Sequence, residues 1–68
     1  MNIEKKFGER VKELRKSLNI SQEELAFRAG LHKNYVSDVE CGRRNVSLRA
    51  IEQFAFGLGV SLKDLMNL

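Results

Sequence analysis

The 68-residue sequence contains no proline, no tryptophan, a single cysteine and only five glycines. Proline and glycine interrupt helices and form the tight turns of β folds, so their scarcity favours helices. One cysteine excludes an internal disulfide, and a small hydrophobic core must therefore hold the chain together. The hydrophobic fraction of 43% suffices for such a core and is too high for a disordered tail. The sequence predicts one all-α domain spanning residues 1–68.

Groups that could perform catalysis are also scarce. His32 and Cys41 are the only histidine and cysteine, and they lie at opposite ends of one predicted helix, too far apart for a base and a nucleophile. The carboxylates are not clustered, so no metal site has its usual number of ligands, and no glycine-rich phosphate loop is present. We therefore expect neither an enzyme nor a bound metal or cofactor. Cys41 is interpreted as a small residue at a helix end rather than a redox switch.

Neither a secretion signal nor a membrane span is predicted. The N-terminal residues MNIEKKFGER are charged throughout, and no apolar run approaches the roughly 20 residues that cross a bilayer. Together with the lone thiol, these absences indicate a protein of the reducing cytoplasm.

Hydrophobic spacing predicts a compact bundle of five helices with short connections. The first runs from about residue 2 to residue 18, with apolar residues three or four apart: Ile3, Phe7, Val11, Leu14 and Leu18. Ser47 and Ser61 are expected to be the N-caps of the fourth and fifth helices. The fourth helix is expected to face the core with Leu48, Ile51, Phe54, Ala55 and Leu58.

The second and third helices lie within the stretch SQEELAFRAGLHKNYVSDVE, residues 21–40. Ser21 and Glu24 have the spacing of a capping box, in which each side chain accepts from the other residue's backbone N–H. Gly30 is a natural helix end, because glycine readily adopts the left-handed conformation. Val36 and Val39 form the buried stripe of the third helix and leave on its outer side Lys33, Asn34, Ser37 and Asp38. This pattern is typical of a helix-turn-helix motif and predicts DNA binding.

The positive charge is concentrated around this motif. Residues 28–49 carry five basic and two acidic side chains, while the rest of the chain carries seven of each, so this segment holds the whole net charge of +3. The excess is consistent with an anion-binding surface on the third helix and the loop after it, or with a solvated basic loop.

The sequence also resembles a known family. The motif, the RNVSL loop, the Tyr35-Val36-Ser37 segment and the closing GLGVSLKDLM are similar to the DNA-binding domain of the lambda and 434 repressor/Cro family. The likeness covers nearly all of the chain and is greatest to controller proteins of restriction–modification systems. It implies that the third helix enters the major groove of double-stranded DNA.

The resemblance assigns base contacts to Lys33 and Asn34 and, after them, to Ser37 and Asp38. Lysine can donate to guanine and asparagine can pair with adenine. Asp38 could accept from cytosine N4, but it could equally repel phosphate or hold Lys33 in position.

Contacts to the DNA backbone are implied for Gln22, His32, Tyr35, Arg43, Arg44 and Asn45, with the minor groove as an alternative for one residue of the loop. For His32, helix capping is the preferred alternative. Arg15 and Glu40 correspond to a structural ion pair of the family, which would join the first helix to the third.

One short helix reads few base pairs, so the family usually binds as a twofold dimer. Three apolar residues are left over after the core is filled and are predicted to form the dimer interface: Phe56, Met66 and Leu68. Phe27 is also off its helix's core stripe. Padding of a small core is the alternative.

The sequence and its resemblance therefore predict a homodimeric transcriptional regulator that binds a pseudo-palindromic operator. It would be bacterial or phage-encoded and nucleoid-associated. It would control restriction–modification genes as repressor or activator and could recruit RNA polymerase. The alternatives are a phage-type or antitoxin-like repressor and a protein-interaction module that keeps the fold without reading DNA.

Overall fold

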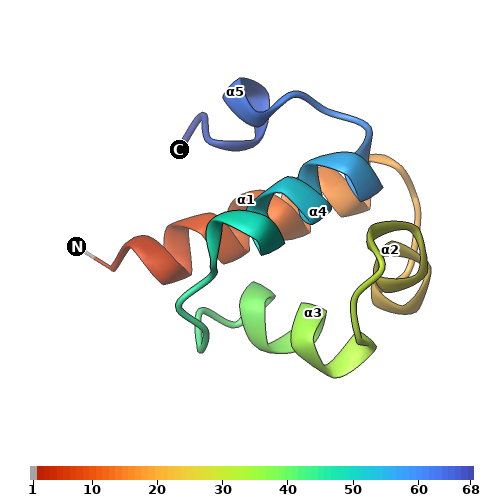
Figure 1. Cartoon of the computed structure of the whole chain (residues 1–68), viewed down its shortest axis with the longest axis horizontal. Helices are drawn as coiled ribbons and strands as arrows, with labels where there is room; N and C mark the ends of the chain where they lie inside the picture. The colour runs from red at the N-terminus through yellow and green to blue at the C-terminus, as the bar shows by residue number, and fades with distance from the viewer. Residues whose placement is uncertain (1) are drawn as a thin grey trace.

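The computed structural model describes residues 2–68, and within them it contains five α-helices and no strand. The helices are α1 (Ile3–Ser17), α2 (Gln22–Ala29), α3 (Lys33–Glu40), α4 (Leu48–Leu58) and α5 (Leu62–Leu65). In Figure 1, α2 and α3 lie on one side of α1 and α4, and α5 lies on the other. The predicted all-α bundle is confirmed.

Side-chain caps and glycines set the helix boundaries. The side-chain oxygens of Ser21, Ser47 and Ser61 each accept from a backbone N–H three residues later, at 3.0–3.1 Å. Gly30 and Gly59 end α2 and α4 in the left-handed conformation, at φ values of 69° and 70°, which costs glycine little because it has no Cβ.

The capping box at the start of α2 is formed in one direction only. Ser21 Oγ accepts from the backbone N–H of Glu24 at 3.0 Å, as expected. The Glu24 carboxylate instead accepts from Arg28 Nε at 2.8 Å, one turn further along α2. Within the described residues, the Glu24 side chain therefore does not accept the expected return bond from the Ser21 N–H, because the charged guanidinium of Arg28 competes for the Glu24 carboxylate.

The core is centred on Phe54 of α4, which is fully buried. The ring of Phe7 meets it edge to face at 5.8 Å, and the ring of Tyr35 stacks on it at 6.3 Å, both measured between centroids. The other four helices contribute further fully buried side chains: Val11, Leu25, Val36, Val39 and Leu65. The recognition motif is thereby packed directly against α1 and α4.

Leu48 was expected in this core, and that expectation is wrong, because its side chain is 86% exposed. It lies about 200° around α4 from the buried Ala50, since each residue advances the helix by about 100°. Leu48, Glu52 and Phe56 are four residues apart and share the outer face of α4. At the two ends of the α1 stripe, Ile3 and Leu18 are 53% and 43% exposed.

Two glycines allow the helices to approach closely. A Cβ added to Gly8 in α1 would overlap the carbonyl oxygen of Val39 and lie 2.9 Å from that of Glu40. A Cβ added to Gly57 in α4 would lie 2.8 Å from the Cβ of Ala29. These crossings fix α3 against α1 and α2 against α4, and the sequence pattern did not reveal them.

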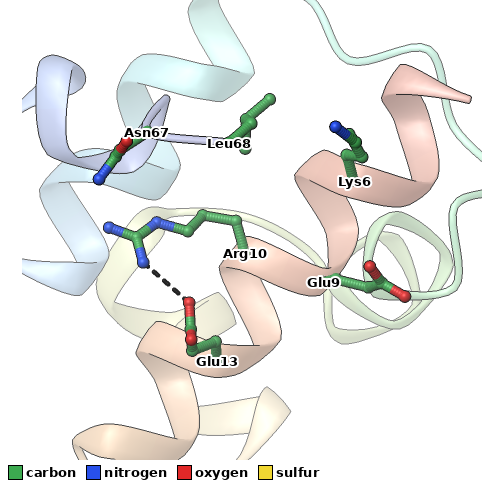
Figure 2. Close-up of a pocket in the computed structure, with 6 residues that line it drawn as sticks. All are labelled: Lys6, Glu9, Arg10, Glu13, Asn67 and Leu68. Atoms are coloured by element: carbon green, nitrogen blue, oxygen red, sulfur yellow. Dashed lines mark hydrogen bonds and ion pairs between the residues drawn. The ribbon is translucent and has the colours of Figure 1, made fainter. Parts of the chain in front are cut away.

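The short helix α5 is held by α1 as well as by the core. Arg10 Nη2 and Nε donate to the carbonyl oxygen of Asp64 at 2.8 and 3.3 Å, and Nη1 donates to Glu13 at 2.8 Å. Figure 2 shows this guanidinium in an open pocket shared with Asn67 and Leu68. The C-terminal residues are therefore tied to α1 by hydrogen bonds.

Candidate nucleic-acid interface

The turn between α2 and α3 is fixed by its own backbone and by α4. The backbone N–H of Leu31 donates to the carbonyl oxygen of Ala26 at 2.8 Å, which completes the left-handed end of α2 at Gly30. Gln53 Nε2, from α4, lies 3.2 Å from the carbonyl oxygen of Ala29 and 3.3 Å from that of Gly30. Gln53 was not singled out from the sequence, because a polar residue on a helix gives no sign of its distant partner.

The C-terminal end of α3 is joined to α1 by an ion pair. Arg15 Nε and Nη2 lie 2.7 and 3.0 Å from the two carboxylate oxygens of Glu40, and Arg15 Nη1 donates to the carbonyl oxygen of Ile20 at 2.8 Å. The Arg15 and Glu40 side chains are only 11% and 2% exposed. The hydrogen bond that Arg15 donates to Glu40 raises the pKa of Arg15 above its ordinary value, although burial opposes it. The Arg15 guanidinium therefore stays charged, and its two parallel bonds to Glu40 fix α3 relative to α1.

Gln22, at the start of α2, completes this junction. Its Nε2 donates to Glu40 Oε1 at 3.0 Å. One amide proton thus points to the buried carboxylate, while the second remains for another acceptor, because a glutamine amide has two N–H donors. The predicted phosphate contact of Gln22 would use this second proton.

The expected reading residues lie together on the outer side of α3. Lys33 and Asn34 in its first turn are exposed, and Ser37 and Asp38 in the next turn are partly exposed. On the opposite side, Val36 and Val39 are completely or almost completely buried. The helix therefore presents one polar side to solvent while its apolar side holds it rigidly to the core.

His32 occupies the N-cap position of α3, but its side chain makes no capping hydrogen bond. The preferred expectation of a capping imidazole is therefore wrong. Serine, threonine, aspartate and asparagine carry a short side-chain oxygen for this role, which histidine lacks. The ring is exposed at the edge of the α3 surface, where a phosphate contact remains a prediction.

Beyond α3, the exposed loop residues Arg43, Arg44 and Asn45 follow Gly42. Gly42 has a φ of 76°, and a Cβ there would lie 2.9 Å from the Cα of Lys5, so both the turn and the close approach of α1 favour glycine. The guanidinium carbon of Arg44 lies 5.2 Å from the centre of the Tyr35 ring, within cation–π range. The basic loop is thus folded back beside α3.

Asp38 faces this loop. Its carboxylate oxygens lie 3.7 Å from Arg43 Nη1 and 3.5 Å from Arg44 Nε. The expected alternative was that Asp38 holds Lys33, but the structure places the carboxylate between the two loop arginines instead.

Residues 2–68 contain no group of three or more histidine, cysteine, aspartate or glutamate side chains that could hold a metal ion. The thiol of Cys41 is free and exposed at the C-cap of α3. No helix in the described part of the chain is long and apolar enough to span a membrane.

Comparison with known proteins agrees with this geometry. Residues 11–65 match the family model described as "Helix-turn-helix". Control protein C.BamHI from Bacillus amyloliquefaciens is 51% identical over 67 residues, covering 97% of this chain and 83% of the relative. Control protein C.MunI from a Mycoplasma species is 40% identical over 67 residues, covering 97% and 90% respectively. The crystal structure of the restriction–modification controller protein C.AhdI from Aeromonas hydrophila superimposes with a TM-score of 0.92 at 44% identity, covering 97% of this chain and all of that one.

Proposed function

The chain belongs to the helix-turn-helix family of DNA-binding transcriptional regulators, with restriction–modification controller proteins among its relatives, and from this we propose that α3 is its recognition helix in the major groove. The observation that carries the proposal is the exposed polar side of α3, fixed by the Arg15–Glu40 pair at one end and by the core beneath it. Lys33 and Asn34 would read base edges, with Ser37 beside them. One unit spanning residues 1–68 would perform this function.

The residues proposed to contact phosphate lie on both sides of this reading surface. His32 lies at the N-terminal end of α3, and the basic loop of Arg43, Arg44 and Asn45 follows its C-terminal end, where Gln22 is hydrogen-bonded to Glu40. Backbone contacts at two separated points fix the register of a helix in its groove without carrying sequence information themselves. Tyr35 is held between Phe54 and Arg44, and its hydroxyl can also donate to a phosphate of the DNA backbone.

We further propose that the protein acts as a homodimer. The outer face of α4 exposes Leu48 and Phe56, 86% and 79% respectively, and Leu62, Met66 and Leu68 nearby are 42–51% exposed. Large exposed apolar side chains on a small protein support an interface, because burying them removes apolar surface from water. A twofold dimer would place two copies of α3 about 34 Å apart and select a pseudo-palindromic operator.

The names of the relatives support control of restriction–modification genes. A dimer on its operator would block RNA polymerase when the site overlaps the promoter, or recruit it when the site lies upstream. Because dimerisation depends on concentration, occupancy would rise steeply as the protein accumulates. The protein would then reside on the bacterial nucleoid.

Selection of binding sites from random DNA duplexes tests the proposal. We expect an enriched sequence with twofold symmetry and half-sites one helical turn apart. Affinity for that duplex should fall with salt at a log–log slope of about −0.9 for each phosphate contact. Recovery of no sequence would instead favour a protein-interaction module that keeps the fold without reading DNA.

A further inference from the structure

Asp38 is the acidic residue of the reading surface, and its position favours a role other than base contact. One carboxylate lies within 3.5–3.7 Å of two guanidinium groups, those of Arg43 and Arg44. The main chain provides a second connection between Asp38 and the loop, since the N–H of Arg43 donates to the carbonyl oxygen of Asp38 at 2.9 Å. Asp38 therefore holds the basic loop through both its main chain and its side chain.

Arg44 is restrained from a second direction. Its guanidinium lies over the Tyr35 ring at 5.2 Å, and that ring stacks on the buried Phe54. Arg44 thus has the Tyr35 ring on one side and the Asp38 carboxylate on another, although its side chain is 52% exposed. A guanidinium has five N–H donors in a planar fork, so the donors turned away from Asp38 stay available for a phosphate.

We propose that Asp38 is a positioning residue that confers specificity: it tethers Arg43 and Arg44 so that they meet the DNA backbone only when α3 is seated in its groove. On the operator, the tethered guanidinium groups would bond to phosphate while they keep Asp38. On an unrelated sequence α3 does not enter the major groove in its full depth, and the ion pairs with Asp38 then keep both arginines from reaching the DNA phosphates. This inference rests on the proposed placement of α3 and its loop, and it replaces the expected contact from Asp38 to cytosine.

The test compares three single variants on two duplexes of equal length, an operator recovered by selection and an unrelated sequence, between about 50 and 200 mM salt. Asp38→Asn removes the tether, and Asp38→Glu keeps its charge. Glu9→Gln is the control for net charge, because Glu9 is an exposed carboxylate of α1 and is not among the residues proposed to contact DNA (Figure 2).

For Asp38→Asn we expect binding to the unrelated duplex to tighten about three- to tenfold, with a salt slope steeper by about one phosphate contact. Affinity for the operator should stay within about twofold of the original protein or fall, since tethered arginines already reach phosphate there. Asp38→Glu and Glu9→Gln should leave unrelated-sequence binding within about twofold of the original protein, because the first keeps the tether and the second removes a carboxylate of α1 that takes no part in the proposed DNA contacts.

A double-mutant cycle with Arg43→Ala/Arg44→Ala locates the effect. In that background Asp38→Asn should change affinity no more than Glu9→Gln does, because the tethered groups are gone. The inference is overturned if Asp38→Asn leaves the unrelated duplex unchanged, or if Asp38→Asn and Asp38→Glu both lose operator affinity selectively at a cytosine position, as a base reader would. Failure of the underlying proposal looks different: Arg43→Ala/Arg44→Ala would then leave both affinities unchanged.

Discussion

Replacing Arg15 by methionine would remove one partner of the ion pair that holds α3 against α1. Glu40 would keep its negative charge inside the protein, where its side chain is 2% exposed, with Gln22 as its remaining side-chain donor. Stranding a buried charge in this way costs about 3–5 kcal/mol. A domain of this length has about 3–10 kcal/mol of stability in total, at 0.05–0.15 kcal/mol per residue. The substitution should therefore remove a large part of the free energy of unfolding.

Thermal unfolding followed by circular dichroism measures this effect. At about 4–8 °C for each kcal/mol, the expected decrease in Tm is at least about 12 °C. Arg28→Met is the matched control, because it removes a pair with Glu24 whose side chains are 46% and 44% exposed, and such a pair on a helix contributes only about 0.3–0.5 kcal/mol. All proteins must be compared at one concentration, since a dimer's Tm depends on it.

The double variant Arg15→Met/Glu40→Met separates the stranded charge from lost packing. With both charges gone, stability should return most of the way to that of the original protein, because apolar replacements of buried pairs are often neutral or stabilising. The reasoning is refuted if Arg15→Met costs no more than Arg28→Met, or if the double variant is as unstable as Arg15→Met.

Three further expectations follow from the structure. Gly8→Ala should lower the free energy of unfolding by roughly 1–3 kcal/mol in a denaturant titration, because its Cβ would overlap the Val39 carbonyl oxygen; an unchanged midpoint would contradict the close crossing. Phe56→Glu should shift the sedimenting species toward the 7.8 kDa monomer, whereas Phe27→Glu, at an equally exposed phenylalanine of α2, should not; the reverse result would move the interface to α2. The raised pKa of Arg15 means that its guanidinium stays protonated through neutral and moderately alkaline pH, and that its contribution to stability is lost only as pH rises through the folded value, so unfolding of Arg15→Met and of the original protein should differ by a constant amount between neutral pH and about pH 10; a difference that decreased within this interval would contradict the assignment.

Local signals in the sequence were sufficient for the helices. The serine caps at Ser21, Ser47 and Ser61 and the helix-ending Gly30 and Gly59 each act within a few residues, so their effect is visible in the sequence itself. Hydrophobic periodicity likewise identified most of the core. It failed at Leu48, whose spacing of three from Ile51 and seven from Ala55 fits the core stripe, although Leu48 lies about 200° around α4 from the buried Ala50.

Features that depend on contacts between distant segments could not be read in the same manner. Gly8 and Gly57 look like weak points in a helix until another backbone is placed against them. Gln53 looks like a solvated polar residue until its amide reaches the turn after α2. Asp38 seemed equally suited to cytosine or to Lys33, and only the folded path of the loop brings Arg43 and Arg44 to it. The candidate reading residues, in contrast, came from their place in a motif with known docking geometry.

The central claim is that α3 reads bases while the loop after it holds the backbone, and base-preference profiles of Lys33→Ala and Arg43→Ala test it most directly. Affinities would be measured for the selected operator and for every single base-pair change in one half-site. Lys33→Ala should lose about 1–3 kcal/mol of discrimination at one position and leave the others unchanged. Arg43→Ala should weaken binding to all sequences by a similar factor and reduce the salt slope by about one contact per subunit. Equal losses for both variants on every sequence would contradict the division between reading helix and anchoring loop.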